Sequence, residues 1–213
     1  YIVRDNNKCI QCMRCVAACK NVQGISVIGP IQRGFKVHVG CAFEKPLGES
    51  PCVGCGQCIV SCPVGALSEK SQIDEVWDAI SDPDKFVVFF TAPSIRASLG
   101  ESFNLPIGTN VEGQMVAAIR RLGVDKVFNM DFTADLTIME EATELITRIQ
   151  NQMTLPMFTS CCPGWVKYVE HYHPELIPNL STCKSPQAMF GAVLKSYYAQ
   201  KYNIDPEQMF VGS

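Results

Sequence analysis

The sequence predicts two domains of different fold class: an α+β domain in residues 1–70 that binds metal, then an α/β domain in residues 71–213 with a mainly parallel, incomplete sheet. Nine of the twelve cysteines lie between Cys9 and Cys62, and the next about a hundred residues contain none. From Ser71 onward, apolar runs of strand length alternate with helical patterns. A chain of 213 residues is long enough for two cores.

Composition argues against several kinds of partner. The formal net charge is −3 and the chain has no polybasic run, whereas nucleic acid and anionic lipid attract basic surfaces. The longest apolar stretch, Phe86–Ala92, is too short to span a membrane. The tight grouping of the cysteines is typical of metal ligands and not of disulfides. We therefore expect a protein of a reducing compartment, the cytoplasm, that binds no nucleic acid and has no membrane span.

Two runs of cysteines share the spacing C-x₂-C-x₂-C-x₃-C. Bacterial two-cluster ferredoxins have this spacing, with three thiolates of a run on one [4Fe–4S] cluster and the fourth on the other cluster. We therefore expect a ferredoxin-like fold for residues 1–70, with two clusters that relay electrons. The predicted ligands are Cys9, Cys12, Cys15 and Cys62 for the first cluster, and Cys52, Cys55, Cys58 and Cys19 for the second.

Two simpler hypotheses compete with this one. Zinc sites pair two C-x₂-C units in a closed tetrahedron and do not need a crossed fourth ligand, so zinc is disfavoured. A plain ferredoxin would need no second domain. Between the runs, residues 25–28 and 35–39 resemble short strands joined through a turn at Gly29-Pro30, and Cys41 is expected to be a free thiol.

In the second domain, predicted helices and strands alternate. A helix begins after Ser71, and Phe86–Phe90 is predicted as a buried strand that ends in Thr91-Ala92-Pro93-Ser94. Open α/β sheets gather functional groups at such carboxyl ends of strands. The remaining predicted elements are a helix at 110–121, a strand at 126–130, a helix at 133–150, a strand at 155–158, a helix at 185–201 and a strand at 209–211.

Two adjacent cysteines, Cys161 and Cys162, follow the strand predicted at 155–158. Pro163 suits the first position of a helix, so the pair is predicted to lie at a strand-to-helix turn. Neighbouring thiols in such a turn point in different directions, so one can bind a metal centre while the other faces the reacting space. A buried structural Cys-Cys pair is the simpler alternative. Cys183 is expected to be a small buried residue.

These motifs together resemble those of the [FeFe] hydrogenases, the enzymes that interconvert protons, electrons and H₂. The resemblance runs from Cys9 to Val211 and implies a ferredoxin-like domain followed by the first half of a catalytic domain. That catalytic domain carries an H-cluster, which is a [4Fe–4S] cluster joined to a di-iron unit. The segments that carry the resemblance are Thr91–Ser94, Ala134–Glu141, Phe158–Trp165 and Ser181–Gln187.

The resemblance implies a role for each matching residue. Cys162 is expected to ligate the cubane half of the H-cluster, and Cys161 to deliver protons to the di-iron half. Pro93 and Ser94 are expected to line the di-iron pocket, with Gln187 nearby. The proton path of the family implies roles for Glu144, Ser181, Glu141 and, at its outer end, Arg148.

The spacing of Glu141, Glu144 and Arg148 supports part of this path independently. These residues are three and four positions apart, so they share one helix face, close to an apolar stripe that includes Ile138 and Ile149. Carboxylates at the edge of a buried face are expected to have raised pKa values. The alternative is a solvated Glu–Arg pair on an exposed face.

Two functions remain open. The family's later motifs, which supply the other H-cluster thiolates, do not occur in these residues, so we expect this chain alone to lack a functional H-cluster. In the first hypothesis it is a segment of a hydrogenase, completed by the remaining C-terminal segment or a complementary chain, with a ferredoxin or a nicotinamide-oxidising subunit as redox partner. In the second it is a non-catalytic electron carrier or redox sensor that reuses the fold. The complete Cys161–Trp165 motif favours the first.

Overall fold

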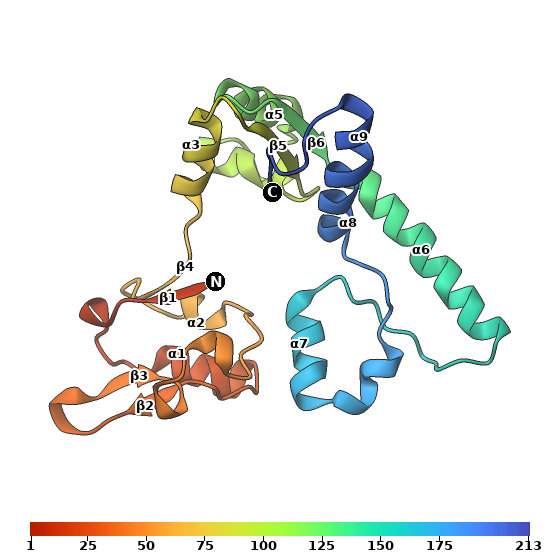
Figure 1. Ribbon diagram of the computed structural model, residues 1–213. Helices are drawn as coiled ribbons and strands as arrows, with labels where there is room; N and C mark the ends of the chain where they lie inside the picture. The colour runs from red at the N-terminus through yellow and green to blue at the C-terminus, as the bar shows by residue number, and fades with distance from the viewer. The chain divides into compact units, whose positions relative to one another are not determined.

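The computed structural model describes all residues, 1–213, and divides them into two compact units (Figure 1). Unit 1 comprises Tyr1–Ser71 and Cys162–Leu180, and unit 2 comprises Gln72–Cys161 and Ser181–Ser213. The division therefore falls between the two adjacent cysteines. None of the helices combines the length with the apolar character that crossing a membrane requires.

Unit 1 contains two small antiparallel sheets and short helices. Strand β1 (Ile2–Arg4) pairs with β4 (Leu67–Glu69), so the two ends of the ferredoxin-like segment meet. Helices α1 (Arg14–Ala17) and α2 (Gln57–Val60) each begin one residue before the third cysteine of a run. Equal cysteine spacing thus leads to the same local structure in both runs.

The hairpin between the two runs differs from the prediction. The antiparallel strands are β2 (Gly29–Ile31) and β3 (His38–Gly40), and residues 25–28 do not form a strand. Ile25 and Ile28 are instead buried in the core of unit 1. The expected turn residue Pro30 stands in β2, which is possible because a two-stranded sheet has edges where a missing N–H is tolerated.

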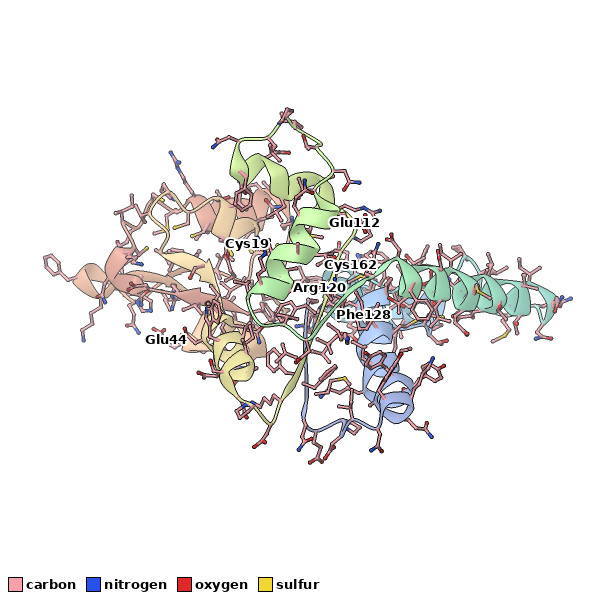
Figure 2. The ribbon with its side chains drawn as sticks, turned by 90° about the horizontal axis from the view of Figure 1, so that it is seen from above. Cys19, Glu44, Glu112, Arg120, Phe128 and Cys162 are labelled. Carbon is pink, nitrogen blue, oxygen red and sulfur yellow. The ribbon has the colours of Figure 1, made fainter.

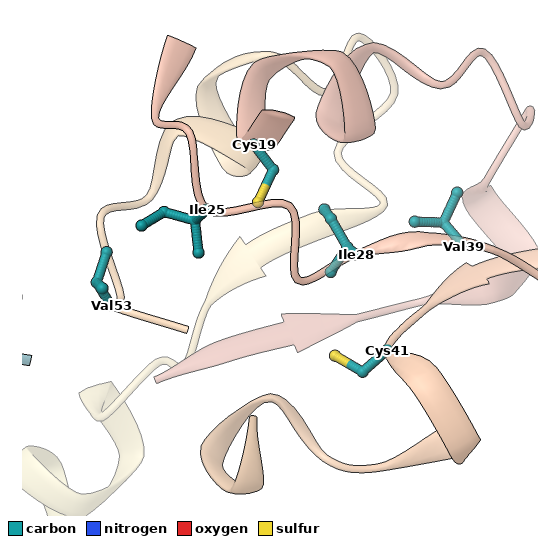
Figure 3. Packing of buried hydrophobic residues seen from close by; sticks show 6 residues of the cluster. All are labelled: Cys19, Ile25, Ile28, Val39, Cys41 and Val53. Atoms are coloured by element: carbon teal, nitrogen blue, oxygen red, sulfur yellow. The ribbon is translucent and has the colours of Figure 1, made fainter. Parts of the chain in front are cut away.

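The core of unit 1 includes a helix from far along the chain. Tyr168 and Tyr172 of α7 (Pro163–Tyr172) pack against this core, and the Tyr172 hydroxyl donates to the carbonyl oxygen of Ile25 at 3.2 Å. Pro163 is the first residue of α7, as predicted. The buried core side chains are Cys19, Ile25, Ile28, Val39, Cys41 and Val53 (Figure 3).

Unit 2 is built on a parallel sheet with strand order β6-β5-β7, which confirms the predicted fold class. Val87 and Val88 of the central strand are fully buried on opposite faces, and each contributes roughly 1.5–3 kcal/mol by leaving water. Helices α3 and α5 cover the Val87 face, and helices α8 and α9 cover the Val88 face. The element bounds are β5 Phe86–Thr91, β6 Lys126–Asn129, β7 Met209–Gly212, α3 Ile73–Ser81, α4 Ile95–Ser98, α5 Glu112–Arg121, α8 Pro186–Val193 and α9 Ala199–Tyr202.

The strand predicted at 155–158 is wrong. Leu155 is exposed, and the segment contributes only one bridge, in which the carbonyl of Phe158 accepts from the Ser181 N–H at 2.7 Å. Pro156 has no N–H to donate to a ladder, which explains why apolar character alone does not make a strand here. The place beside β5 is taken by β7.

In helix α6 (Asp131–Gln150), the apolar face is exposed and the polar face is buried, which is the reverse of the prediction. The predicted apolar stripe is exposed, with Ile138 at 65% and Ile149 at 56%. The buried residues are polar: Thr133, Thr137 and Arg148. Their spacing places them on one face, and Glu141 and Glu144 belong to the same face. This helix therefore presents a polar face to the interior of unit 2.

Candidate metal centres and a buried acidic network

Each crossed set of four cysteines lines one cavity. Cys19, Cys52, Cys55 and Cys58 line one cavity, and Cys9, Cys12, Cys15 and Cys62 line another. The fourth cysteine of each run thus lies in the cavity of the other run. The structure brings together the two sets that the crossed pattern predicts.

The two runs also share an unusual backbone. Gln11 and Met13 have φ values of 55° and 60°, and Gly54 and Gly56, at the equivalent positions, have values of 71° and 74°. A left-handed conformation costs roughly 1–3 kcal/mol in a residue other than glycine and persists only where the surrounding structure enforces it. The first run therefore keeps the conformation of the second despite its side chains, which indicates that the cysteine positions require this path.

The arrangement of the donors suits a cluster of several metal ions. All twelve cysteines are free thiols, and no three His, Cys, Asp or Glu side chains lie close enough to hold a single ion. In a tetrahedral zinc site, with Zn–S bonds near 2.3 Å, the sulfur atoms would lie about 3.8 Å apart. Four thiols on the walls of a cavity fit an iron–sulfur cluster instead. This geometry disfavours zinc.

The thiols of the cavity around Cys58 are poorly suited to ionise without a metal. Burial, together with the charges of Cys52 and Cys55, raises the pKa of Cys58 to about 11. Burial also raises the pKa of Cys52, and the charges of Cys55, Cys19 and Cys41 add to that effect. A bound cation compensates such charges and deprotonates a coordinating thiol. A metal cluster bound in this cavity would therefore stabilise these thiols as thiolates.

Within unit 1, helix α7 lies against the second run. Cys162, which is labelled in Figure 2, is the residue directly before Pro163, the first residue of this helix. A Cβ placed on Gly164 would lie 3.2 Å from the carbonyl oxygen of Val53, and Val53 lines the cavity of the second run. Glycine at 164 therefore allows the close approach of the two backbones. Cys162 thus opens a helix that contacts the loop around this cavity.

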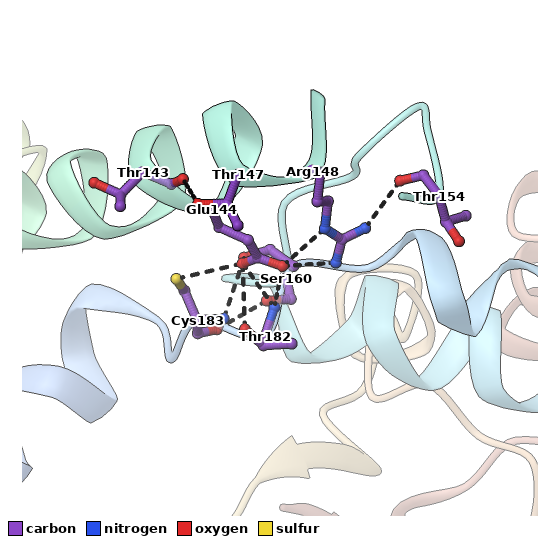
Figure 4. A network of polar contacts seen from close by, with 9 residues as sticks. Thr143, Glu144, Thr147, Arg148, Thr154, Ser160, Thr182 and Cys183 are labelled. Atoms are coloured by element: carbon purple, nitrogen blue, oxygen red, sulfur yellow. Dashed lines mark hydrogen bonds and ion pairs between the residues drawn. The ribbon is translucent and has the colours of Figure 1, made fainter. Parts of the chain in front are cut away.

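Glu144 is the centre of a buried network in unit 2 (Figure 4). Its carboxylate accepts hydrogen bonds from Arg148 Nη2 at 2.6 Å, from Ser181 Oγ at 2.8 Å and from the Thr182 N–H at 3.1 Å. The side chains of Glu144 and Arg148 are only 15% and 7% exposed. The alternative of a solvated pair on an exposed face is therefore wrong.

The expected raised pKa is also wrong for Glu144. Burial acts to raise the pKa of this carboxyl, but the Ser181 hydroxyl, the Arg148 guanidinium and the Thr182 N–H together hold it below its usual value. The sequence pattern shows the spacing of Glu144 and Arg148 but not that Ser181 and Thr182 return to the same helix. A carboxylate with these partners stays ionised at neutral pH.

Cys183 belongs to the same network. Its sulfur lies 3.7 Å from Glu144 Oε2, and its N–H donates to Ser181 Oγ at 3.1 Å. Burial raises the pKa of this thiol, and the charges of Glu144 and Glu141 add to the effect. Glu141 is therefore close to the network, whereas Cys161 is exposed and forms no hydrogen bond with it. Cys183 is half-buried and contacts Glu144 and Ser181, so the expectation of a small buried residue misses its polar contacts.

Pro93, Ser94 and Gln187 lie at one edge of the sheet of unit 2. Pro93 and Ser94 follow the end of β5 and are exposed, and Gln187 Nε2 donates to Ser213 Oγ at 2.7 Å, directly after β7. Because β5 and β7 are parallel neighbours, these residues share the carboxyl edge. Ligands of open α/β sheets bind at this edge.

A charged cluster at the same edge was not predicted. Arg96 Nη1 lies 3.0 Å from Asp131 Oδ2, and Asn129 Nδ2 donates to Asp131 at 2.9 Å and to Glu112 at 3.2 Å. These contacts tie the segments that follow β5 and β6 to the starts of α5 and α6. The sequence does contain one signal for this cluster, because Asn129 lies near the end of a predicted strand and Asp131 directly follows it, where functional groups of such sheets gather.

Comparison with known proteins identifies the class first. Residues 1–68 match the family model of the ferredoxin-like domain of NADH-quinone oxidoreductase subunit 3, as expected for an iron–sulfur electron-transfer protein. Residues 85–213 match the C-terminal domain of the iron-only hydrogenase large subunit. The chain therefore belongs to the [FeFe] (iron-only) hydrogenase family, which confirms the resemblance seen in its motifs.

Individual relatives agree with this assignment. The chain is 49% identical over its full length to the NADP-reducing hydrogenase subunit HndD of Solidesulfovibrio fructosivorans, and 48% identical over 97% of its length to iron hydrogenase 1 of Clostridium pasteurianum. It spans 37% and 36% of those two proteins. An apo [FeFe]-hydrogenase from Chlamydomonas reinhardtii has the same fold over 67% of this chain and 37% of its own, with a TM-score of 0.63 and 41% identity.

Proposed function

We propose that this chain is the electron-relay and proton-delivery part of an [FeFe] hydrogenase that reversibly reduces protons to H₂. One observation carries the proposal: each crossed set of four thiols lines one cavity, and the loop around the cavity of Cys58 contacts the helix that Cys162 opens. When bound, two [4Fe–4S] clusters would pass electrons singly. Residues 1–70 would then serve as the relay domain and residues 71–213 as part of the catalytic domain.

Cys162 is proposed to supply one thiolate to the H-cluster, with Pro93, Ser94 and Gln187 contacting the cofactor from the carboxyl edge of the sheet. One thiolate does not fit the complete cofactor, because its cubane half alone needs several. The proposal therefore requires the remaining ligands to come from other residues of the whole enzyme.

The proposed proton path uses groups of unit 2. Cys161 is proposed as the thiol that delivers the proton, with Glu141, Ser181 and Glu144 as relay groups. The Ser181 hydroxyl can accept one proton while it donates another to Glu144. Arg148 holds the Glu144 carboxylate in place and keeps it ionised, so Glu144 would carry a proton only transiently.

The proposed partner and compartment follow from the relatives and the thiols. The relative from Solidesulfovibrio fructosivorans is a subunit of an NADP-reducing hydrogenase, which supports a partner subunit that exchanges electrons with a nicotinamide nucleotide. A ferredoxin is the other class of partner that we propose. Twelve free cysteines suit a reducing compartment, and we propose the cytoplasm.

A second candidate is a non-catalytic iron–sulfur protein. The cytosolic iron-sulfur assembly component 3 of Bos taurus is 30% identical to this chain over 75% of its length. The two hydrogenases compared above are 49% and 48% identical to this chain, and this higher identity favours the hydrogenase.

Hydrogen evolution from reduced methyl viologen tests the proposal, using the matured holoprotein that contains this chain under anaerobic conditions. Cys161→Ser is expected to lower the rate at least about a hundredfold, because general acid catalysis contributes that much, while iron content stays unchanged. Glu144→Gln should also slow turnover, whereas Glu140→Gln, an exposed carboxylate on the same helix, should not. Unchanged turnover in Cys161→Ser, or no turnover in the wild type, contradicts the proposal.

A further inference from the structure

The hydroxyl of Tyr172 joins two backbone segments of unit 1 that are far apart in the sequence. It donates to the carbonyl oxygen of Ile25 at 3.2 Å and to the carbonyl oxygen of Pro51 at 3.4 Å. A hydroxyl has a single proton, so the two carbonyl groups share it. Tyr172 is the last residue of α7, and the end of this helix is thus fastened to both segments.

Each of the two segments carries a proposed ligand of the second cluster. Pro51 directly precedes Cys52, and the Ile25 N–H donates to the carbonyl oxygen of Cys19 at 3.0 Å. Cys52 belongs to the second run, whereas Cys19 is the crossed ligand from the first run. Ile25 lines the cavity together with both cysteines. The Tyr172 hydroxyl therefore connects the two runs at the wall of this cavity.

The surroundings of the hydroxyl agree with this position. Burial raises the pKa of Tyr172, and the charges of Cys19 and Cys52 add to the effect, so the hydroxyl lies close to both thiols. The Tyr172 ring stacks on the ring of Tyr168, with 5.4 Å between the centroids, and both rings pack against the core of unit 1. This packing holds the ring in place independently of the hydroxyl.

Tyr168 offers a matched comparison on the same helix. Its hydroxyl lies 3.3 Å from Nε2 of His173, which belongs to neither cysteine run. The two tyrosines thus share a helix and a core, but their hydroxyl groups have different partners. A contribution of the Tyr172 hydroxyl to the second cluster can therefore be separated from a contribution of aromatic packing.

We propose that Tyr172 is a positioning residue of the second cluster, whose hydroxyl holds the Cys19 and Cys52 segments together and so keeps water out of their cavity. The inference rests on the proposed binding of a [4Fe–4S] cluster by Cys19, Cys52, Cys55 and Cys58. Solvent exposure is one of the properties that set the potential of such a cluster. Reduction adds negative charge, which water stabilises, so opening this cavity raises the potential.

Tyr172→Phe tests the proposal, because it removes the hydroxyl and keeps the ring. The two potentials are measured by redox titration with electron paramagnetic resonance on the anaerobically reconstituted chain, and the signal that Cys52→Ala abolishes belongs to the second cluster. Tyr172→Phe should raise the potential of this cluster and leave that of the first unchanged. A chelator should also remove about four of about eight iron atoms roughly tenfold faster than in wild type.

Tyr168→Phe is the control and should change neither the potentials nor the rate of iron loss. Unchanged potentials in Tyr172→Phe overturn the proposal even if the unfolding midpoint falls, because a merely structural hydroxyl would affect stability alone. An equal shift in Tyr168→Phe, or a general loss of folding in Tyr172→Phe, also overturns it. Wild type that binds no iron–sulfur cluster contradicts the proposed function itself.

Discussion

The cysteine-lined cavities of unit 1 and the Glu144 network of unit 2 are both buried polar sites, but they differ in completeness. The Cys58 and Cys52 thiols have pKa values raised by burial and surround open space. The pKa of Glu144 is lowered by hydrogen bonds and an ion pair that already occupy both of its carboxylate oxygens. The cysteine-lined cavities would need a bound metal cluster to stabilise their thiolates, whereas all partners of the Glu144 carboxylate come from the chain itself.

Iron loading provides the largest expected difference between the two sites. Cluster binding should raise the thermal unfolding midpoint of unit 1 by at least about 10 °C, because metal binding adds directly to folding free energy and each kcal/mol shifts a domain of this size by several degrees. The transition of unit 2 should move much less. Calorimetry of apo and reconstituted protein measures both transitions, and equal midpoints for unit 1 would contradict the account.

The next largest expected effect is a loss of stability when the Glu144 network of unit 2 loses its cation. Arg148→Met leaves the Glu144 carboxylate buried without its cation and should cost unit 2 about 3 kcal/mol of unfolding free energy. Urea denaturation measures the loss. Arg121→Met, at an exposed position near the end of α5, should change stability by less than about 0.5 kcal/mol.

A double variant sharpens this result. Adding Glu144→Gln to Arg148→Met removes the stranded charge and should restore part of the lost stability. If the double variant is less stable than Arg148→Met alone, the ion pair is not what makes the single variant unstable.

The pH dependence of unit 2 should show a smaller effect with a defined sign. The folded pKa of Glu144 is below its unfolded value, so its contribution is present above the unfolded pKa, about 4.3 for glutamate, and is lost as pH falls through the folded pKa. Urea titrations at pH 7 and at progressively lower pH should show a steeper loss in wild type than in Glu144→Gln. Parallel curves would exclude Glu144 as a contributor.

The smallest expected effect distinguishes the two cysteine runs. Gln11→Gly relieves the left-handed strain but also removes the hydrogen bond from Gln11 Nε2 to the Val37 carbonyl oxygen, so it should stabilise the apo protein by less than about 1 kcal/mol. Gly54→Ala, at the equivalent position, should destabilise it, since its Cβ would also lie 3.0 Å from the Tyr1 ring. Effects of the opposite sign would show that these conformations do not constrain the runs.

The sequence predicted features whose physical cause is local. Cysteine spacing indicates which thiols approach one another, and Pro163 begins α7 as its fixed backbone angle suggests. The alternation of elements also predicted the parallel sheet. These features depend on neighbours within a few residues, so pattern and stereochemistry were sufficient.

Local patterns did not predict features that depend on distant segments, and only the family resemblance placed Ser181 in one path with Glu144. The buried face of α6 is polar because Ser181 and Thr182, more than thirty positions along the chain, supply partners for Glu144. The segment at 155–158 looks like a strand by composition, yet β7 occupies the place beside β5. The inclusion of Cys162–Leu180 in unit 1 likewise depends on packing of α7 that no local pattern encodes.

The crossed assignment of the eight cysteines is the central claim, and iron binding to a chain with one run disabled tests it directly. A variant with Cys52, Cys55 and Cys58 replaced by alanine should retain about four iron atoms. Adding Cys62→Ala should lower that number, whereas adding Cys19→Ala should leave it unchanged. The reverse result, with iron lost only on removal of Cys19, would mean that each run holds its own cluster and would contradict the account.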